Sequence, residues 1–117
     1  MRDPERDPGR LEHILMAIDK IEEYTQGISY AQLVADSMRL HATVYNVQIV
    51  GEAAYKLTHE FKASHTTVNW KQIEKMRHIL VHDYYKISFR IVWNVVEEDI
   101  PYLKSEVRRF LDEIGQE

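Results

Sequence analysis

Apolar residues recur every three or four positions along most of this chain, a spacing that an α-helix turns into one continuous face. The pattern is longest between about Asp36 and His59. Its stripe consists of Leu40, Val44, Val47, Val50, Ala54 and Leu57, widened by Ala42, Ile49 and Ala53. A helix that is apolar over so much of its circumference lies at the centre of a fold or in an interface. Gly51 inside it costs about 1 kcal/mol relative to alanine, so we expect another helix to approach closely there.

Residues 11–24 show a second amphipathic pattern, with charged side chains between the apolar ones. This pattern predicts a helix that Gly27 ends, and Ser29 is suited to cap a short helix that follows. A Pro-Gly pair stands just before the pattern. We therefore expect residues 1–10 to form a flexible lead to a single helical domain that covers residues 11–114.

Two further helices are expected in the second half of the chain. Asn69 can cap a helix that begins at Trp70 and ends between residues 82 and 85. Another helix starts near Ser88 and carries apolar residues at helical spacing almost to the C-terminus. Pro101 lacks a backbone donor, so we expect a kink or a break in this last helix.

The remaining segments support an all-α fold. No segment alternates apolar and polar residues as a half-buried strand does, and residues 63–68 are expected to form a loop. The pattern predicts an up-and-down bundle of four main helices plus a short helix. With 117 residues the chain forms one domain by size but buries a limited core. We therefore expect it to oligomerise.

Composition excludes several classes of protein. The chain has no cysteine, which rules out disulfides, thiolate nucleophiles and cysteine zinc sites and fits a cytoplasmic location. The N-terminus is charged, and no apolar run approaches the roughly 20 residues that span a bilayer. We expect a soluble protein with no membrane partner and no cofactor. Four of the six histidines lack the spacing of metal ligands, so we assign no metal site: His13, His41, His59 and His65.

Charge is distributed unevenly along the chain. The net charge is −4, yet residues 71–90 carry five lysine or arginine side chains against two acidic ones. A locally basic segment on an acidic protein suits a confined anionic ligand, such as one RNA strand or a nucleotide, better than a long duplex. The alternative is a helix face that is basic and simply solvated.

Residues 75–85 concentrate the side chains that can act on a phosphate. Arg77 carries a planar fork of donors that stays charged, and His82 carries an imidazole, the side chain best suited to moving a proton near neutral pH. Tyr84 adds a hydroxyl two residues beyond His82. In its order of Arg, four residues, His, one residue and Tyr, the segment resembles the signature of the HEPN superfamily, specifically its HepT-like branch, which is known for toxin endoribonucleases.

The resemblance extends beyond this motif. Residues 46–53 are similar to the second helix of that family, and Trp70 and Trp93 stand where the branch usually has tryptophan. The likeness spans roughly residues 11–111, which is nearly the whole chain. One position departs from it, because HepT-like sequences usually have asparagine directly after the motif arginine and this chain has His78.

The resemblance implies a homodimeric, HEPN-like endoribonuclease toxin of a type II or type VII-like toxin–antitoxin system, which needs no metal. It implies Arg77 and His82 as catalytic residues in a composite site at the dimer interface, with RNA such as tRNA or mRNA as the substrate. It also implies a cognate nucleotidyltransferase antitoxin that transfers AMP to the motif tyrosine, here Tyr84. Tyr85 is the alternative acceptor.

Geometry limits how the two catalytic candidates can cooperate. Arg77 and His82 are five residues apart, which separates them by roughly 140° around a straight helix. They can act on one phosphate if the helix unwinds near His82, or if a two-fold axis brings one copy's groups beside the other's.

The residue types favour RNA cleavage, because RNA carries its own nucleophile in the 2′-hydroxyl. His82 is suited to general acid–base catalysis, and Arg77 to holding the phosphate and stabilising its developing charge. Lys75 and His78 could assist in binding RNA. Two other classes remain open: a non-catalytic HEPN domain that binds a nucleotide or a nucleotidyltransferase partner with the same side chains, and an interaction bundle with no ligand.

Overall fold

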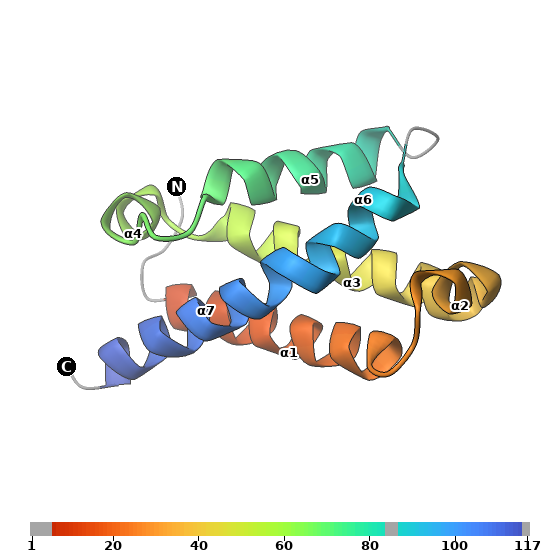
Figure 1. Cartoon of the computed structure of the whole chain (residues 1–117). Coiled ribbons are helices and arrows are strands. Elements are labelled where there is room, and N and C mark those ends of the chain that lie inside the picture. Colours follow the sequence, from red (N-terminus) through yellow and green to blue (C-terminus); the bar gives the residue numbers. More distant parts are fainter. Residues whose placement is uncertain (1–5, 84–86, 116–117) are drawn as a thin grey trace.

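The computed structural model describes residues 6–83 and 87–115, and all of the secondary structure in this part of the chain is helical. The prediction of an all-α fold is thereby confirmed. Figure 1 shows the elements in chain order. They are α1 (Asp7–Thr25), α2 (Tyr30–Ala35), α3 (Ser37–Lys56), α4 (His59–Ser64), α5 (Trp70–His82), α6 (Phe89–Asn94), the π-helical segment η3 (Val95–Asp99) and α7 (Ile100–Gly115).

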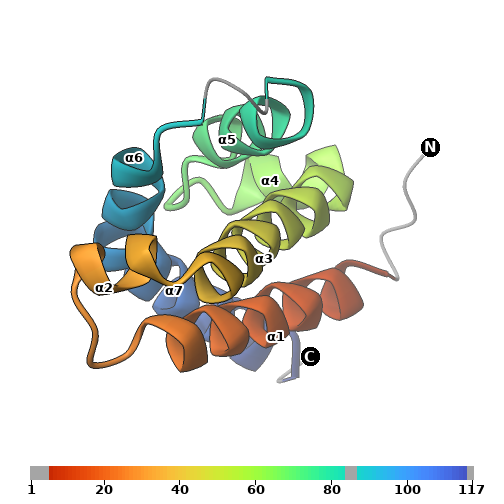
Figure 2. The same ribbon diagram turned by 90° about the vertical axis from the view of Figure 1, so that its right-hand side faces the viewer.

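Helix α3 occupies the centre of the bundle, as its broad apolar stripe predicts. It packs against α1 on one side and α5 on the other, and α7 closes the fold against α1 (Figure 2). Its apolar stripe is buried between these neighbours together with side chains of α1 and α7, among them Leu11, Ile18, Val107 and Phe110. No helix within the described residues is long and apolar enough to cross a membrane.

The expected helix caps are present. Ser29 begins α2 with a capping box, because its hydroxyl accepts a hydrogen bond from the Gln32 amide at 3.1 Å and its own amide donates to the Gln32 side chain at 2.8 Å. The Asn69 side chain accepts from the Gln72 amide at 3.2 Å and begins α5. These local patterns set where both helices start.

The start of α1 and the whole of α4 differ from the sequence-based expectation. Helix α1 begins at Asp7 rather than at residue 11, and residues 63 and 64 belong to the end of α4 rather than to a loop. One contact joins the starts of these two helices. The buried Asp7 carboxylate accepts hydrogen bonds from the amide of Thr58 at 3.0 Å and from its hydroxyl at 2.7 Å, and Thr58 caps α4.

The expected irregularity before Pro101 takes the form of a π-helical segment. The amide of Ile100 donates to the carbonyl of Val95, five residues earlier, at the junction of η3 and α7. Pro101, which has no amide hydrogen to donate, follows directly as the second residue of α7. The last helix therefore continues past the proline with one widened turn.

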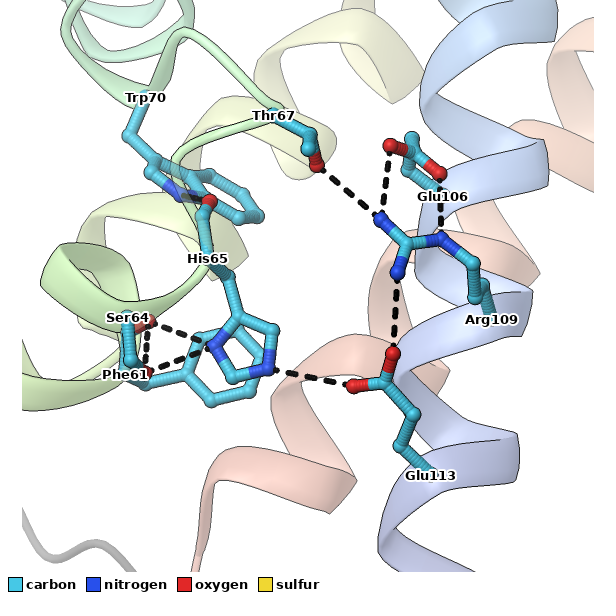
Figure 3. A network of polar contacts seen from close by, with 8 residues as sticks. All are labelled: Phe61, Ser64, His65, Thr67, Trp70, Glu106, Arg109 and Glu113. Atoms are coloured by element: carbon cyan, nitrogen blue, oxygen red, sulfur yellow. Dashed lines mark hydrogen bonds and ion pairs between the residues drawn. The ribbon is translucent and has the colours of Figure 1, made fainter.

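A polar network fixes the loop before α5 to α7 (Figure 3). The Arg109 guanidinium donates to Glu106 at 2.9 and 3.0 Å, to Glu113 at 2.9 Å and to Thr67 at 3.3 Å. The His65 ring stacks on Phe61 and lies 3.6 Å from a Glu113 oxygen. Hydrogen bonds from Arg109, and then from Thr67, lower the pKa of Glu106 from 4.5 to about 2.

We expect this network to make stability depend on acid pH. Because the folded-state pKa of Glu106 is depressed, its contribution is present above pH 4.5 and is lost as the pH falls toward about 2. The melting temperature of the Glu106→Gln variant should therefore fall less than that of the parent between about pH 6 and pH 3. Glu97→Gln, at an exposed position, serves as the control. If the melting temperatures of the parent and of Glu106→Gln fall equally with pH, Glu106 is not the source of the acid sensitivity.

Candidate active site

Arg77 is held between α5 and α3 by an ion pair. Its Nε donates to a Glu52 carboxylate oxygen at 2.8 Å, and its guanidinium carbon lies 4.8 Å from the centre of the Tyr55 ring. Both partners belong to α3, one turn apart. This ion pair uses Nε, and the Arg77 side chain remains 22% exposed.

Gly51 makes this arrangement possible and confirms the expected close helix approach. A Cβ atom at this position would overlap the Cβ of Arg77 and lie 3.3 Å from its Cα. The backbones of α3 and α5 therefore meet at Gly51 and Arg77. The neighbouring Glu52 can reach the guanidinium because α5 lies so near.

Replacing Gly51 with alanine should destabilise the fold. The added methyl group meets backbone-proximal atoms of Arg77, so α5 must move away from α3. Overpacking of this kind costs typically 1–3 kcal/mol, about as much as or more than the gain from removing a helical glycine. Urea denaturation should show the loss of stability as a lower midpoint concentration for Gly51→Ala than for the parent.

Gly115→Ala is the matched control, because an added Cβ there meets nothing within 4 Å. A Gly51→Ala variant that unfolds at the same urea concentration as the parent would show that the two helices can separate without cost.

His82 lies on a different side of α5 from Arg77. The helix continues through His82, and the Asp83 amide donates to the Ile79 carbonyl at 2.9 Å. Unwinding near His82, one of the two routes by which it could meet Arg77, is therefore not seen. The separation of roughly 140° that the sequence predicts remains.

The other side chains of the motif segment are distributed as follows. Lys75, His78 and His82 are exposed on α5. The rings of His78 and His82 contact each other, with their centres 4.6 Å apart. Tyr84 and Tyr85 fall outside the described residues. The structure thus brings His82 together with His78, and Arg77 together with Glu52.

The sequence interpretation missed the roles of Glu52 and Tyr55. Glu52 is directly next to the glycine that marks the close helix approach, so its position was a usable signal for a partner of Arg77. Its second oxygen lies 3.7 Å from the Lys56 ammonium one turn further on. Glu52 therefore bridges two cations at this surface.

A cavity of about 340 Å³ lies between α3, α5, η3 and α7. Its walls are mainly apolar, including Val47, Val50, Ile73, Met76 and Leu103. Arg77, His78 and His82 do not line it. The cavity is therefore separate from the candidate active site.

Comparison with known proteins places this geometry in a family. The family model described as Ribonuclease HepT-like matches residues 14–110, a range that includes Glu52, Arg77 and His82. The chain belongs to the HepT-like family. A comparison with solved structures found no match.

Several curated relatives align with most of this HepT-like chain. A candidate RNase of Caldanaerobacter subterraneus subsp. tengcongensis is 38% identical over 101 residues, which cover 86% of this chain and 90% of the relative. A probable ribonuclease HepT of Thermococcus cleftensis is 34% identical, over 85% of this chain and 90% of the relative. A candidate RNase of Methanocaldococcus jannaschii is 32% identical, over 80% and 86% respectively.

Proposed function

We propose that this HepT-like protein is an endoribonuclease in which Arg77 and His82 are the catalytic residues. The observation that carries the proposal is the placement of Arg77. Glu52 and Tyr55 hold its guanidinium between α3 and α5, on the helix that also carries the exposed His78 and His82. The family match and the RNase names of the relatives support RNA as the substrate.

The chemistry needs only the groups that these residues supply. The 2′-oxygen of RNA attacks the adjacent phosphorus, and the bond to the 5′-oxygen of the next nucleotide breaks. His82 accepts the 2′-hydroxyl proton, and a protonated histidine returns a proton to the leaving oxygen. Arg77 stabilises the negative charge that develops on the phosphorane. The products are a 2′,3′-cyclic phosphate and a free 5′-hydroxyl.

A second copy of the chain completes the proposed site. Because α5 remains helical through His82, Arg77 and His82 of one chain face different directions. A two-fold axis close to α5 would place these residues from both copies around one phosphate. The proposed enzyme is therefore a homodimer, and tRNA or mRNA is its candidate substrate.

Alanine replacement of either catalytic residue tests the proposal. Purified protein should cleave RNA in the presence of EDTA and leave 2′,3′-cyclic phosphate ends. His82→Ala and Arg77→Ala should each reduce the rate by about 10²–10⁴-fold, the range expected for loss of acid–base or charge stabilisation. His13→Ala, an exposed histidine on α1, should cleave as the parent does.

Two results would contradict the proposal. Cleavage by His82→Ala at the parental rate would remove His82 from the mechanism. A folded parent that binds a nucleotidyltransferase but cleaves no RNA would favour the alternative function, a non-catalytic partner subunit.

We further propose that the protein is the toxin of a type II or type VII-like toxin–antitoxin pair, silenced by a nucleotidyltransferase that transfers AMP to Tyr84. The transfer joins the Tyr84 oxygen to the α-phosphorus of ATP and releases pyrophosphate. The added phosphodiester and adenosine would compete with the RNA phosphate for Arg77 and exclude RNA by volume.

Incubation with the partner enzyme, ATP and magnesium should add whole AMP masses to the peptide that contains Tyr84, with parallel loss of nuclease activity. Tyr85→Phe is the matched control and should be modified as the parent is. If Tyr84→Phe is modified and silenced as fast as the parent, another residue is the acceptor.

A further inference from the structure

The contact between His78 and His82 supports a function beyond RNA cleavage. The two residues are four positions apart on α5, so their side chains leave the same face of the helix. Their ring centres are 4.6 Å apart, the ring planes make an angle of 46°, and both side chains are exposed. Two imidazoles in this relation can bind one ion from the solvent side.

The ring separation agrees with shared coordination. An imidazole nitrogen binds zinc at about 2.1 Å, which puts the centres of two rings on one tetrahedral ion about 5.2 Å apart, slightly more than the 4.6 Å between these rings. Histidines four residues apart on a helix are a known arrangement for binding one zinc ion. Both residues are exposed, so their side chains can rotate until one nitrogen of each ring reaches the same ion.

We propose that His78 and His82 bind one divalent transition metal ion, with zinc as the representative of the class. Imidazole nitrogen suits Zn²⁺, Ni²⁺ and Cu²⁺, whereas Mg²⁺ prefers oxygen ligands. Within the described residues no group of three or more histidine, aspartate or glutamate side chains is placed to hold a metal. The proposed site thus has two protein ligands, His78 and His82, and water completes the shell, so binding is weaker than at a structural zinc site with four protein ligands.

Metal binding would inhibit the proposed nuclease, and this part of the inference rests on the proposed function. A metal ion uses the same nitrogen lone pair with which His82 would accept the 2′-hydroxyl proton. A histidine that coordinates zinc therefore cannot act as a base. In this proposal His78 is the second metal ligand. A residue without a metal-binding nitrogen could not take its place.

Zinc titration of the full chain tests the site independently of activity. After dialysis against EDTA and then buffer, calorimetric titration with zinc chloride should show saturable binding to the parent. His78→Asn and His82→Asn should each weaken binding by at least about tenfold, because each removes one of two ligands. His13→Asn should bind as the parent does, and magnesium chloride should give no binding at this site.

Two calorimetric outcomes would overturn the site. Absence of saturable zinc binding to the parent would show that the two rings only pack against each other. Unchanged affinity in His78→Asn would show that zinc binds elsewhere on the chain.

An RNA cleavage assay tests the inhibition separately. Each variant's rate is compared with its own rate without zinc, so that any role of His78 in binding RNA cancels. Zinc should reduce parental cleavage by at least about tenfold at saturation, over the same concentrations that fill the site, while His78→Asn loses less than about twofold.

Equal inhibition of the parent and His78→Asn would overturn the regulatory role. If the parent cleaves no RNA, the proposed function fails, while the calorimetric result still decides whether the metal site exists.

Discussion

The approach of α5 to α3 at Gly51 is the contact on which the candidate site depends. Only a residue without a Cβ lets the two backbones meet at Arg77. This short distance brings Glu52 within 2.8 Å of the guanidinium and Tyr55 beneath it. A larger residue would separate the helices and leave Arg77 without these partners. The glycine therefore matters for the position of Arg77 rather than for the flexibility of α3.

The rest of the bundle fixes the two ends of α5 differently. Near its start, the indole of the buried Trp70 donates to the His65 carbonyl at 2.9 Å, and Glu74 binds Lys62 of α4 at 2.7 Å. The Arg109 network then ties the preceding loop to α7. The opposite end of the helix carries exposed histidines instead. The fold thus anchors α5 at its start and leaves the histidines of its last turns exposed.

Local patterns in the sequence predicted the features that depend on local physics. Apolar periodicity located the long helices, Ser29 and Asn69 marked helix starts, and Gly51 indicated the close approach. Contacts between distant residues were not predictable in this way. Asp7 binds Thr58 across 51 positions, and Glu52 binds Arg77 across 25. Nothing in the sequence near Asp7 specifies Thr58, and the glycine beside Glu52 indicates a close helix without specifying Arg77, so the early start of α1, α4 and the anchor of Arg77 were missed.

Catalysis and metal inhibition, as proposed, make different demands on the same helix. Arg77 and His82 of one chain diverge around α5, so the proposed reaction needs two copies. His78 and His82 contact each other within one chain, so both protein ligands of the proposed metal site come from the same copy. A single ion would therefore disable His82 before or after two copies meet. In the proposed dimer the histidines of both copies surround one phosphate. One metal ion on either copy would then stop RNA cleavage by the whole dimer.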